Sequence, residues 1–138
     1  MSDVYFIIDG SWSTEQYKQK IIADVNSYME YCPYKTFTVC VFAKHIDVIV
    51  NRMCQSYISD YDVGGPTRLY DSLEEIFVQA DLECTKPPVI VIWTDGEDTA
   101  STRCTKIDIE SAIQEYKTRG WKFDFMCINP FRRIPLYY

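Results

Sequence analysis

The stretch FIIDGSWST, Phe6–Thr14, decides the predicted fold, because an apolar run ends abruptly at an acid and hydroxyl side chains follow. The run Val4–Ile8 is rich in β-branched and aromatic residues, which is typical of a strand buried on both faces. Asp9, Ser11 and Ser13 then carry oxygen atoms at alternate positions. In folds with parallel sheets, ligands bind beyond the carboxyl ends of the strands, so this segment indicates a binding site.

The remaining sequence alternates between strand and helix patterns. Apolar residues at helical spacing predict three helices, over Thr14–Cys32, Thr67–Ala80 and Thr105–Arg119. Further strands are predicted at Thr36–Phe42, Ile46–Val50, Pro87–Thr94 and Trp121–Ile128, the first two joined as an antiparallel hairpin.

This order, β α β β α β α β, predicts a doubly wound, Rossmann-like α/β fold. We expect a mostly parallel sheet with one antiparallel edge hairpin, helices on both faces, and an end after the fifth or sixth strand. The predicted domain spans residues 1–130, and residues 131–138 form a short aromatic tail.

Composition narrows the functional class. The chain has 138 residues and a net charge of −6, and its only basic pair is Arg132–Arg133, which argues against nucleic acid or an anionic membrane as partner. The six cysteines form no C-x-x-C pair and there is a single histidine, so a zinc site is not expected. The N-terminal MSDVYF does not resemble a signal peptide and no apolar run reaches the ~20 residues that span a bilayer, so we expect a cytoplasmic protein.

A second strand has the same kind of ending as the first. The segment Ile92–Gly96 carries Asp95, and if both strands are central and parallel, Asp9 and Asp95 share one rim of the sheet. Adjacent strands lie only ~4.8 Å apart, and two carboxylates that close repel unless a cation or a proton lies between them. The turn GGP can bring the Thr67 hydroxyl to the same rim.

The predicted metal ligands are all oxygen atoms, from Asp9, Ser11, Ser13, Thr67 and Asp95. Oxygen ligands without sulfur or imidazole favour a hard cation, Mg²⁺ first, with Mn²⁺ or Ca²⁺ as alternatives. A coordination position left open on such an ion would attract an Asp or Glu of another protein.

Four segments, DVYFIIDGSWST, GGPTRLYDSL, VIVIWTDGEDTAS and GWKFDFMCIN, resemble the blocks of the von Willebrand factor A-like domain, in its short, stand-alone bacterial or viral type. The resemblance runs from about Asp3 to Asn129. It implies that the five oxygen-bearing residues form a metal-ion-dependent adhesion site, with the three hydroxyls on the metal and the two aspartates often acting through water. Trp12 departs from the family, in which many members have Gly, and larger members continue with another strand and helix after Ile128.

The expected function is therefore a divalent-metal-dependent protein-interaction module that binds an acidic residue of a partner and has no enzymatic activity. One alternative is a Mg²⁺-dependent phosphatase or phosphotransfer domain, although such domains tend to present D-x-D and a late lysine where this chain has D-x-S and Asn129. A third is a structural subunit with a vestigial metal site. The oligomeric state is not predicted.

Several of these residues also have simpler interpretations. Ser11, Ser13 or Thr14 can cap the first predicted helix, and Thr67 can cap the second. Asp95 and Gly96 can simply form a turn. Trp12 is either a core residue or an exposed aromatic contact for a partner. Solvated surface positions are expected for His45, Arg68, Glu97 and Asp98.

Overall fold

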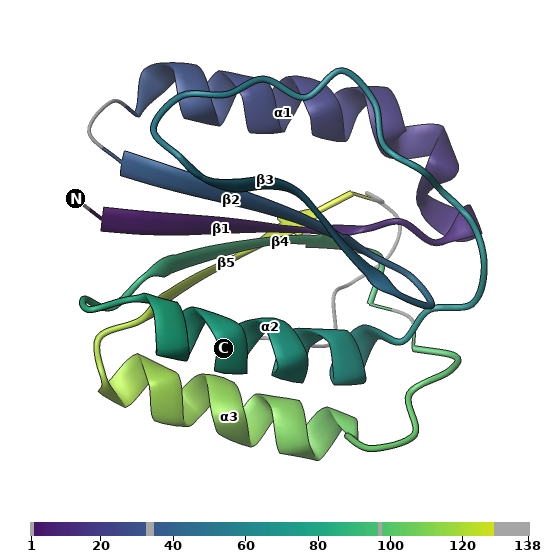
Figure 1. Ribbon diagram of the computed structural model, residues 1–138. Helices are drawn as coiled ribbons and strands as arrows, with labels where there is room; N and C mark the ends of the chain where they lie inside the picture. Colours follow the sequence, from purple (N-terminus) through teal and green to yellow (C-terminus); the bar gives the residue numbers. More distant parts are fainter. Residues whose placement is uncertain (1, 33–34, 97, 129–138) are drawn as a thin grey trace.

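The computed structural model describes residues 2–32, 35–96 and 98–128 and shows a sheet between two layers of helices (Figure 1). The predicted tail 131–138, Pro33 and Glu97 lie outside the described residues. In chain order the elements are β1 Ser2–Asp9, the 3₁₀ helix η1 Trp12–Tyr17, α1 Lys18–Tyr31, β2 Lys35–Phe42, β3 Ile46–Met53, α2 Leu69–Glu83, β4 Val89–Thr94, α3 Lys106–Thr118 and β5 Lys122–Cys127.

The described strands form one five-stranded sheet in the order β3-β2-β1-β4-β5. β1 lies parallel to both β2 and β4, β4 lies parallel to β5, and β2 and β3 form an antiparallel pair. Helix α1 covers one face, and α2 and α3 cover the other (Figure 1). The chain order reverses direction at β1, which confirms the predicted doubly wound α/β fold with an antiparallel edge hairpin.

The central strand β1 explains why its apolar run is continuous rather than alternating. Val4, Phe6 and Ile8 pack into the core on the α1 side, whereas Tyr5 and Ile7 pack into the core beneath α2 and α3. All five side chains are at most 2% exposed. A strand that is buried on both faces cannot carry polar residues until it leaves the sheet, so the first polar side chain, Asp9, marks the rim.

The sheet is covered less completely on the α1 side of β5. Lys122 and Asp124 pair with Val89 and Val91, whose side chains belong to the α1 core, and both charged residues are exposed. Within the described residues, α1 is the only α-helix on that face. The charges on β5 suit a strand that no described helix covers on this face.

The first predicted helix is wrong in its first turn. Residues 12–17 form the 3₁₀ helix η1 and α1 begins at Lys18, and the side chains of the capping residues Ser11 and Tyr17 make no cap hydrogen bond. Thr14 is fully buried, and its hydroxyl donates to the main-chain oxygens of Asp9 and Ser11, each at 2.8 Å. Its bonds therefore hold the loop after β1 instead of the start of a helix.

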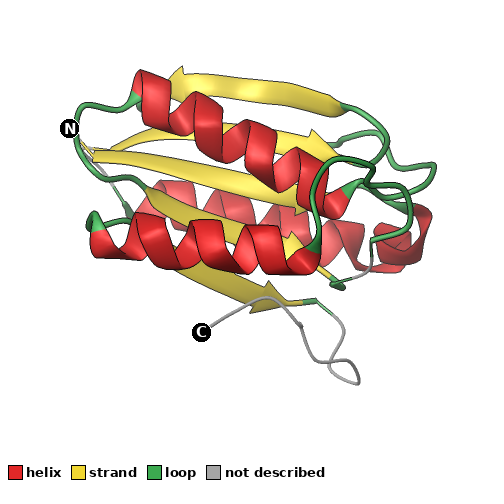
Figure 2. Ribbon diagram, turned by 90° about the horizontal axis from the view of Figure 1, so that it is seen from below, coloured by secondary structure: helices red, strands yellow, loops and turns green. Residues whose placement is uncertain are grey.

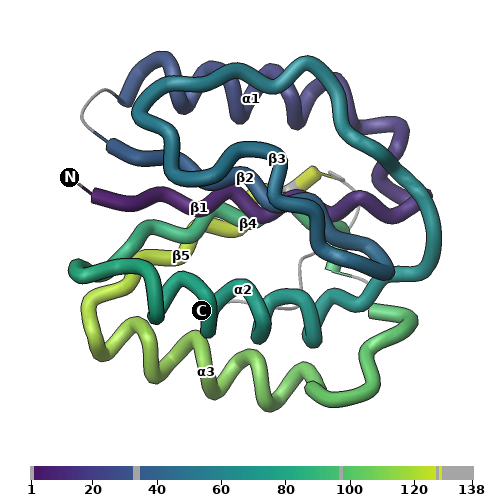
Figure 3. The backbone as a smooth tube through the Cα atoms, in the orientation of Figure 1, coloured from purple at the N-terminus to yellow at the C-terminus, as the bar shows by residue number. Residues whose placement is uncertain are grey.

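Residues 54–68 run from β3 across the α1 side and down to α2 (Figure 3). The Asn26 side chain fixes this path through two hydrogen bonds, since it donates to the Ile58 oxygen at 2.8 Å and accepts from the Ile58 nitrogen at 2.9 Å. Ile58 and Tyr61 are buried in the core on that side. The segment thereby delivers Thr67 to the carboxyl ends of the strands.

Among the described residues, no helix combines the length and the apolar character that crossing a membrane requires.

Candidate metal centre

The carboxyl ends of β1 and β4 bring Asp9 and Asp95 to one rim of the sheet. The two strands are paired neighbours, with Ile8 opposite Trp93. Asp9 is fully buried and Asp95 is 5% exposed. Two acids thus lie under the surface at the place where the sequence predicts a ligand site.

Hydrogen bonds join four of the five predicted ligands into one cluster. The Ser11 nitrogen donates to Asp9 Oδ1 at 2.9 Å, and the hydroxyls of Ser11 and Ser13 lie 3.0 Å apart. Ser13 Oγ donates to Asp95 Oδ2 at 2.6 Å. The D-x-S-x-S spacing therefore lets one short loop link the ends of two strands.

Thr94 completes this cluster and was missed by the sequence analysis. Its hydroxyl donates to Asp9 Oδ2 at 2.9 Å and accepts from the Gly96 nitrogen at 3.0 Å. Thr94 is fully buried as the last residue of β4. The sequence signal for this role is a hydroxyl residue directly before Asp95, but the strand pattern alone also accounts for a threonine at that position.

The pKa of Asp9 is raised to about 6, mainly by burial and to a smaller extent by the nearby Asp95 charge, and this value already includes the opposing effect of hydrogen bonds from Ser11 and Thr94. In the absence of a cation, the carboxylate of Asp9 is therefore less stable than that of an exposed aspartate, although it still predominates at pH 7. A bound cation would reverse this, because it would stabilise both buried carboxylates.

The raised pKa predicts that the metal-free protein becomes more stable on mild acidification. An unfolded Asp titrates near 3.9, so the folded state holds an extra proton between about pH 4 and 6. That stabilisation is complete below about pH 4 and is lost as the pH rises through 6. We expect the free energy of unfolding in EDTA to rise by about 1–2 kcal/mol from pH 7.5 to pH 5, measured by urea denaturation. An unchanged or lower free energy of unfolding at pH 5 would contradict a raised pKa of Asp9 in the folded protein.

Gly10 lets the loop after β1 pack closely against its neighbours. Its nitrogen donates to the Phe42 oxygen at 2.6 Å, and its oxygen accepts from the Gly64 nitrogen at 2.8 Å. A Cβ atom here would lie 2.8 Å from Val41 Cγ1 and within 3.3 Å of the main-chain oxygens of Phe42 and Asp62. Only glycine fits this position without displacing main chain.

We therefore expect Gly10→Ala to destabilise the protein by about 1–3 kcal/mol, through overpacking rather than through backbone strain. Chemical denaturation with and without Mg²⁺ measures the effect. Gly65→Ala is a useful comparison, because it tests backbone strain without overpacking. A Cβ on Gly65 would have nothing within 4 Å, but the residue has a positive φ of 86°. Wild-type stability of Gly10→Ala would show that the loop after β1 adjusts freely.

Thr67, the fifth predicted ligand, is held at the rim by its main chain. It is 4% exposed, and its nitrogen donates to Thr99 Oγ1 at 2.9 Å. The Thr67 oxygen accepts from the nitrogens of Thr99 and Ala100, each at 2.9 Å. Thr67 is thus tied to the loop that follows Asp95. The helix starts later than predicted, at Leu69, so Thr67 does not cap it.

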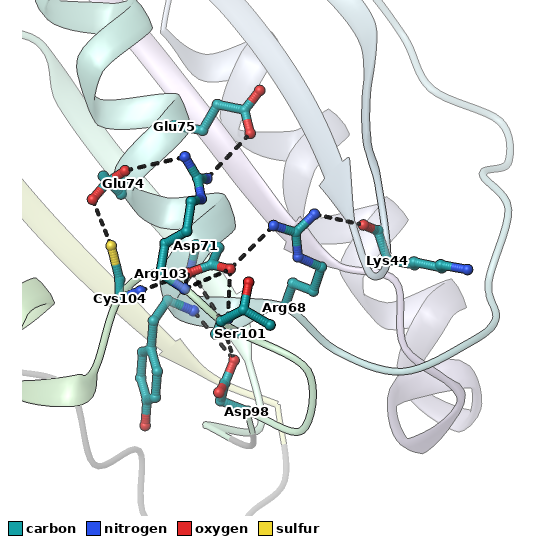
Figure 4. A network of polar contacts seen from close by, with 11 residues as sticks. Lys44, Arg68, Asp71, Glu74, Glu75, Asp98, Ser101, Arg103 and Cys104 are labelled. Atoms are coloured by element: carbon teal, nitrogen blue, oxygen red, sulfur yellow. Dashed lines mark hydrogen bonds and ion pairs between the residues drawn. The ribbon is translucent and has the colours of Figure 1, made fainter.

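Beneath this loop lies Asp71, a buried carboxylate that the sequence analysis did not single out (Figure 4). It accepts from the main-chain nitrogens of Thr102 at 2.8 Å, Arg103 at 3.1 Å and Cys104 at 2.8 Å. The Arg68 guanidinium donates to it at 3.1 Å. Burial alone would raise the pKa of Asp71, but these donors outweigh burial and hold the pKa at about 2.

The loop in turn caps the start of α2. The Asp71 nitrogen donates to Ser101 Oγ at 3.0 Å, and the Tyr70 nitrogen donates to Asp98 Oδ1 at 3.4 Å. Asp98 and Arg68 are therefore not the simple solvated residues that the sequence suggested (Figure 4). The first turn of a helix has unpaired N–H groups, and here side chains from a neighbouring loop satisfy them.

Trp12 and His45 are both exposed. Trp12 has 69% of its surface accessible, which settles its two interpretations in favour of an exposed aromatic. Its ring borders Gly64, since a Cβ on Gly64 would lie 3.0 Å from Trp12 Nε1. His45 lies on the surface between β2 and β3, as predicted.

The donor set fits a hard cation. Within residues 2–32, 35–96 and 98–128, no group of three or more His, Cys, Asp or Glu side chains is arranged for a metal. A cation at this rim would therefore need hydroxyl oxygens besides the carboxylates of Asp9 and Asp95, which is a donor set suited to Mg²⁺. The buried, destabilised charge of Asp9 is the feature of this structure that such an ion would relieve.

No protein-family model and no curated protein matches this sequence. Solved structures do match its fold. The ArnB paralog VWA2 from Sulfolobus acidocaldarius aligns with a TM-score of 0.63 and 18% identity, over 80% of this chain and 31% of that one. Proximal thread matrix protein 1 from the mussel byssus aligns with a TM-score of 0.65 and 15% identity, over 91% of this chain and 37% of that one.

An aerotolerance-related membrane protein from Bacteroides fragilis, solved with multiple mutations to serines, has a TM-score of 0.63 and 14% identity, over 91% of this chain and 66% of that one. The chain thus spans about a third of the first two structures and about two thirds of this one. At these identities the similarity concerns the fold alone, and the fold is that of VWA2 and the other solved structures described here.

Proposed function

We propose that this protein is a Mg²⁺-dependent protein-interaction module. The observation that carries the proposal is the buried Asp9, whose carboxylate charge is destabilised by burial and which shares one hydrogen-bonded cluster with Ser11, Ser13 and Asp95. Asp9, Asp95 and the hydroxyls of Ser11, Ser13 and Thr67 would hold the ion. Mn²⁺ and Ca²⁺ are alternative occupants.

The proposed partner presents an Asp or Glu to the metal. Hydroxyl ligands are neutral, and a carboxylate that acts through a water molecule does not contact the ion directly. The charge of the ion would then be only partly cancelled, so a carboxylate from a partner would be a favourable additional ligand. Trp12 stands exposed next to Ser11 and Ser13 in the sequence and offers apolar contact area to the same partner. The similar solved structures support this proposal only through their shared fold.

We propose that the module has no enzymatic activity of its own. Metal-assisted hydrolysis needs a positioned base or a metal-activated water in a pocket that excludes bulk solvent. The single histidine is exposed between β2 and β3, and Ser13 lies exposed at the surface. Among the proposed ligands only Ser13 is exposed, so a partner side chain would reach the ion from the side of Ser13.

The test combines metal titration with a capture experiment. Isothermal titration with MgCl₂ should show one site in the wild-type protein and none in the Ser11→Ala, Ser13→Ala double variant. A display library of random peptides, selected in Mg²⁺ and eluted with EDTA, should be enriched in peptides that contain Asp or Glu. Absence of Mg²⁺ binding by the wild-type protein would overturn the proposal. Hydrolysis of an aryl phosphate that requires Mg²⁺ and Asp95 would favour the phosphatase alternative instead.

A further inference from the structure

Strand β3 forms an open edge of the sheet. It is the outermost strand next to β2, and nothing described lies outside it along the upper edge in Figure 2. Within the described part of the chain, the only backbone partner that the β3 ladder has is β2. An unpaired strand edge offers a row of N–H and C=O groups to which another extended chain can add.

On the α2 side of this edge lies a hollow of about 220 Å³ that is lined by apolar and polar side chains. Its walls include Val48 on β3, Cys40 on β2 and Ile76 on α2. Val48 pairs with Cys40, so it faces α2, yet it remains 54% exposed because α2 does not reach over β3. Glu75 and Glu83 stand at the same hollow.

On the opposite side of the edge lies a second, acidic hollow of about 510 Å³. Asp47 faces it from β3, where it pairs with Val41 of the α1 core, and Asp60 and Asp62 face it from the loop before α2. Asp60 forms an ion pair with Lys18, but no Lys or Arg is among the residues that line the hollow. Lys44 lines an adjoining hollow together with Asp47 and Asp62, so this side of the edge carries an excess of negative charge that is only partly compensated.

We propose that the β3 edge binds an extended segment of another protein in which apolar residues alternate with Lys or Arg. Successive side chains of an added strand point to opposite faces of the sheet. Apolar side chains would enter the hollow beside Val48, and the intervening basic side chains would meet Asp47 and Asp62. Main-chain pairing supplies affinity and the two hollows supply specificity.

The irregular shape of β3 limits the length of this contact. Cys40 pairs with Val48 while Val39 pairs with Val50, so Ile49 is an extra residue in the strand. Arg52 then adopts a positive φ of 51°. Such bulges twist an edge and interrupt its pairing. The regular part is Ile46–Val48, which fits a short added strand.

A second copy of this chain is a poor occupant of the same edge. Pairing β3 with another β3 would bring Asp47 and its acidic hollow against a like-charged surface. The net charge of −6 adds to that repulsion and favours a basic partner.

The probe is a capped peptide of seven residues, Lys-Val-Lys-Val-Lys-Val-Lys, titrated into ¹⁵N-labelled protein in EDTA and 150 mM salt. EDTA keeps the proposed metal site out of the measurement, so this test and the test of the metal site fail independently. A scrambled peptide of equal composition controls for charge alone. A peptide N-methylated at alternate residues controls for main-chain pairing. We expect shifts centred on Ile46–Val48 and at least tenfold weaker binding by both controls.

Substitutions at the β3 edge and at control positions test where the peptide binds. Val48→Asp should weaken binding of the alternating peptide at least tenfold, whereas Val78→Asp, at a position on α2 that is also half-exposed, should change it less than twofold. The double variant Asp47→Asn, Asp62→Asn should weaken binding at least fivefold, with Glu30→Gln on α1 as its control.

Equal binding of the scrambled or N-methylated peptide would overturn the proposal, as would equal effects of the two valine substitutions. The charge variants keep the question decidable if Val48→Asp does not fold. A concentration-dependent dimer that Val48→Asp disrupts, seen by sedimentation, would assign the edge to a second copy and also overturn it.

Discussion

Replacing Asp71 by alanine is expected to lower the free energy of unfolding by about 3–5 kcal/mol, the largest effect of any single substitution considered. The change removes a buried carboxylate that accepts from the nitrogens of Thr102, Arg103 and Cys104. The N–H group of Cys104 would be left without an acceptor in a buried place, and those of Thr102 and Arg103 in a partly buried one. The Arg68 guanidinium would also lose its carboxylate partner. Urea denaturation at pH 7 measures the loss.

The exposed acid Asp81 on the same helix is the matched control. It pairs with Arg119 at the surface, so Asp81→Ala should cost less than about 1 kcal/mol. The pKa of Asp71 also gives the effect a pH signature, since its stabilisation is present above about pH 4 and is lost as the pH falls toward 2. Similar losses in the two variants would show that the buried contacts of Asp71 add nothing beyond an ordinary surface pair.

Asp9→Asn is expected to have opposite effects on stability and on metal binding. At pH 7 the buried Asp9 is largely ionised although its pKa is raised, so a neutral isostere should stabilise the metal-free protein by about 1–3 kcal/mol. In the wild-type protein, Mg²⁺ at tens to hundreds of times its Kd should add about 1–3 kcal/mol, and the variant should lose that gain. Thermal unfolding in EDTA and in MgCl₂ shows both effects.

A structural role for Asp9 alone would give a different result. Asp9→Asn would then destabilise the protein in EDTA, because Ser11 and Thr94 would lose a charged acceptor, and Mg²⁺ would leave both proteins unchanged. Asp81→Asn again serves as the control and should respond to Mg²⁺ as the wild-type protein does. The sign of the change in EDTA therefore separates a metal ligand from a structural acid.

The fold could be predicted because its signals are local and strong. The run Val4–Ile8 is apolar without interruption, and only a strand buried on both faces needs that pattern. The short link before Ile46 allowed only an antiparallel hairpin, as observed. The turn at residues 12–17 was less predictable, because Ser13 and Thr14 look like helix caps while tertiary contacts use them differently.

The candidate site could be predicted for those ligands that lie at or just after the end of a strand. Asp9, Ser11, Ser13 and Asp95 could be grouped because parallel strands end at one rim. The roles of Thr94 and Asp71 could not be predicted, because they depend on which loop packs against each residue in the folded protein. Asp71 sits two residues into a helix, where an acid is usual for reasons of charge alone, and nothing local shows that it is buried.

The reciprocal bonding between the start of α2 and the loop after β4 has a consequence for how this protein fluctuates. Since the loop caps the helix and the helix anchors the loop, neither can open while the other stays closed. Deuterium exchange at the amides of Tyr70, Thr102 and Cys104 should then give one common free energy of opening, as expected for parts of a single cooperative unit. Thr67 is bonded to the same loop, which also follows Asp95. Binding of a ligand at the rim would therefore change the opening of the loop and of the start of α2 together.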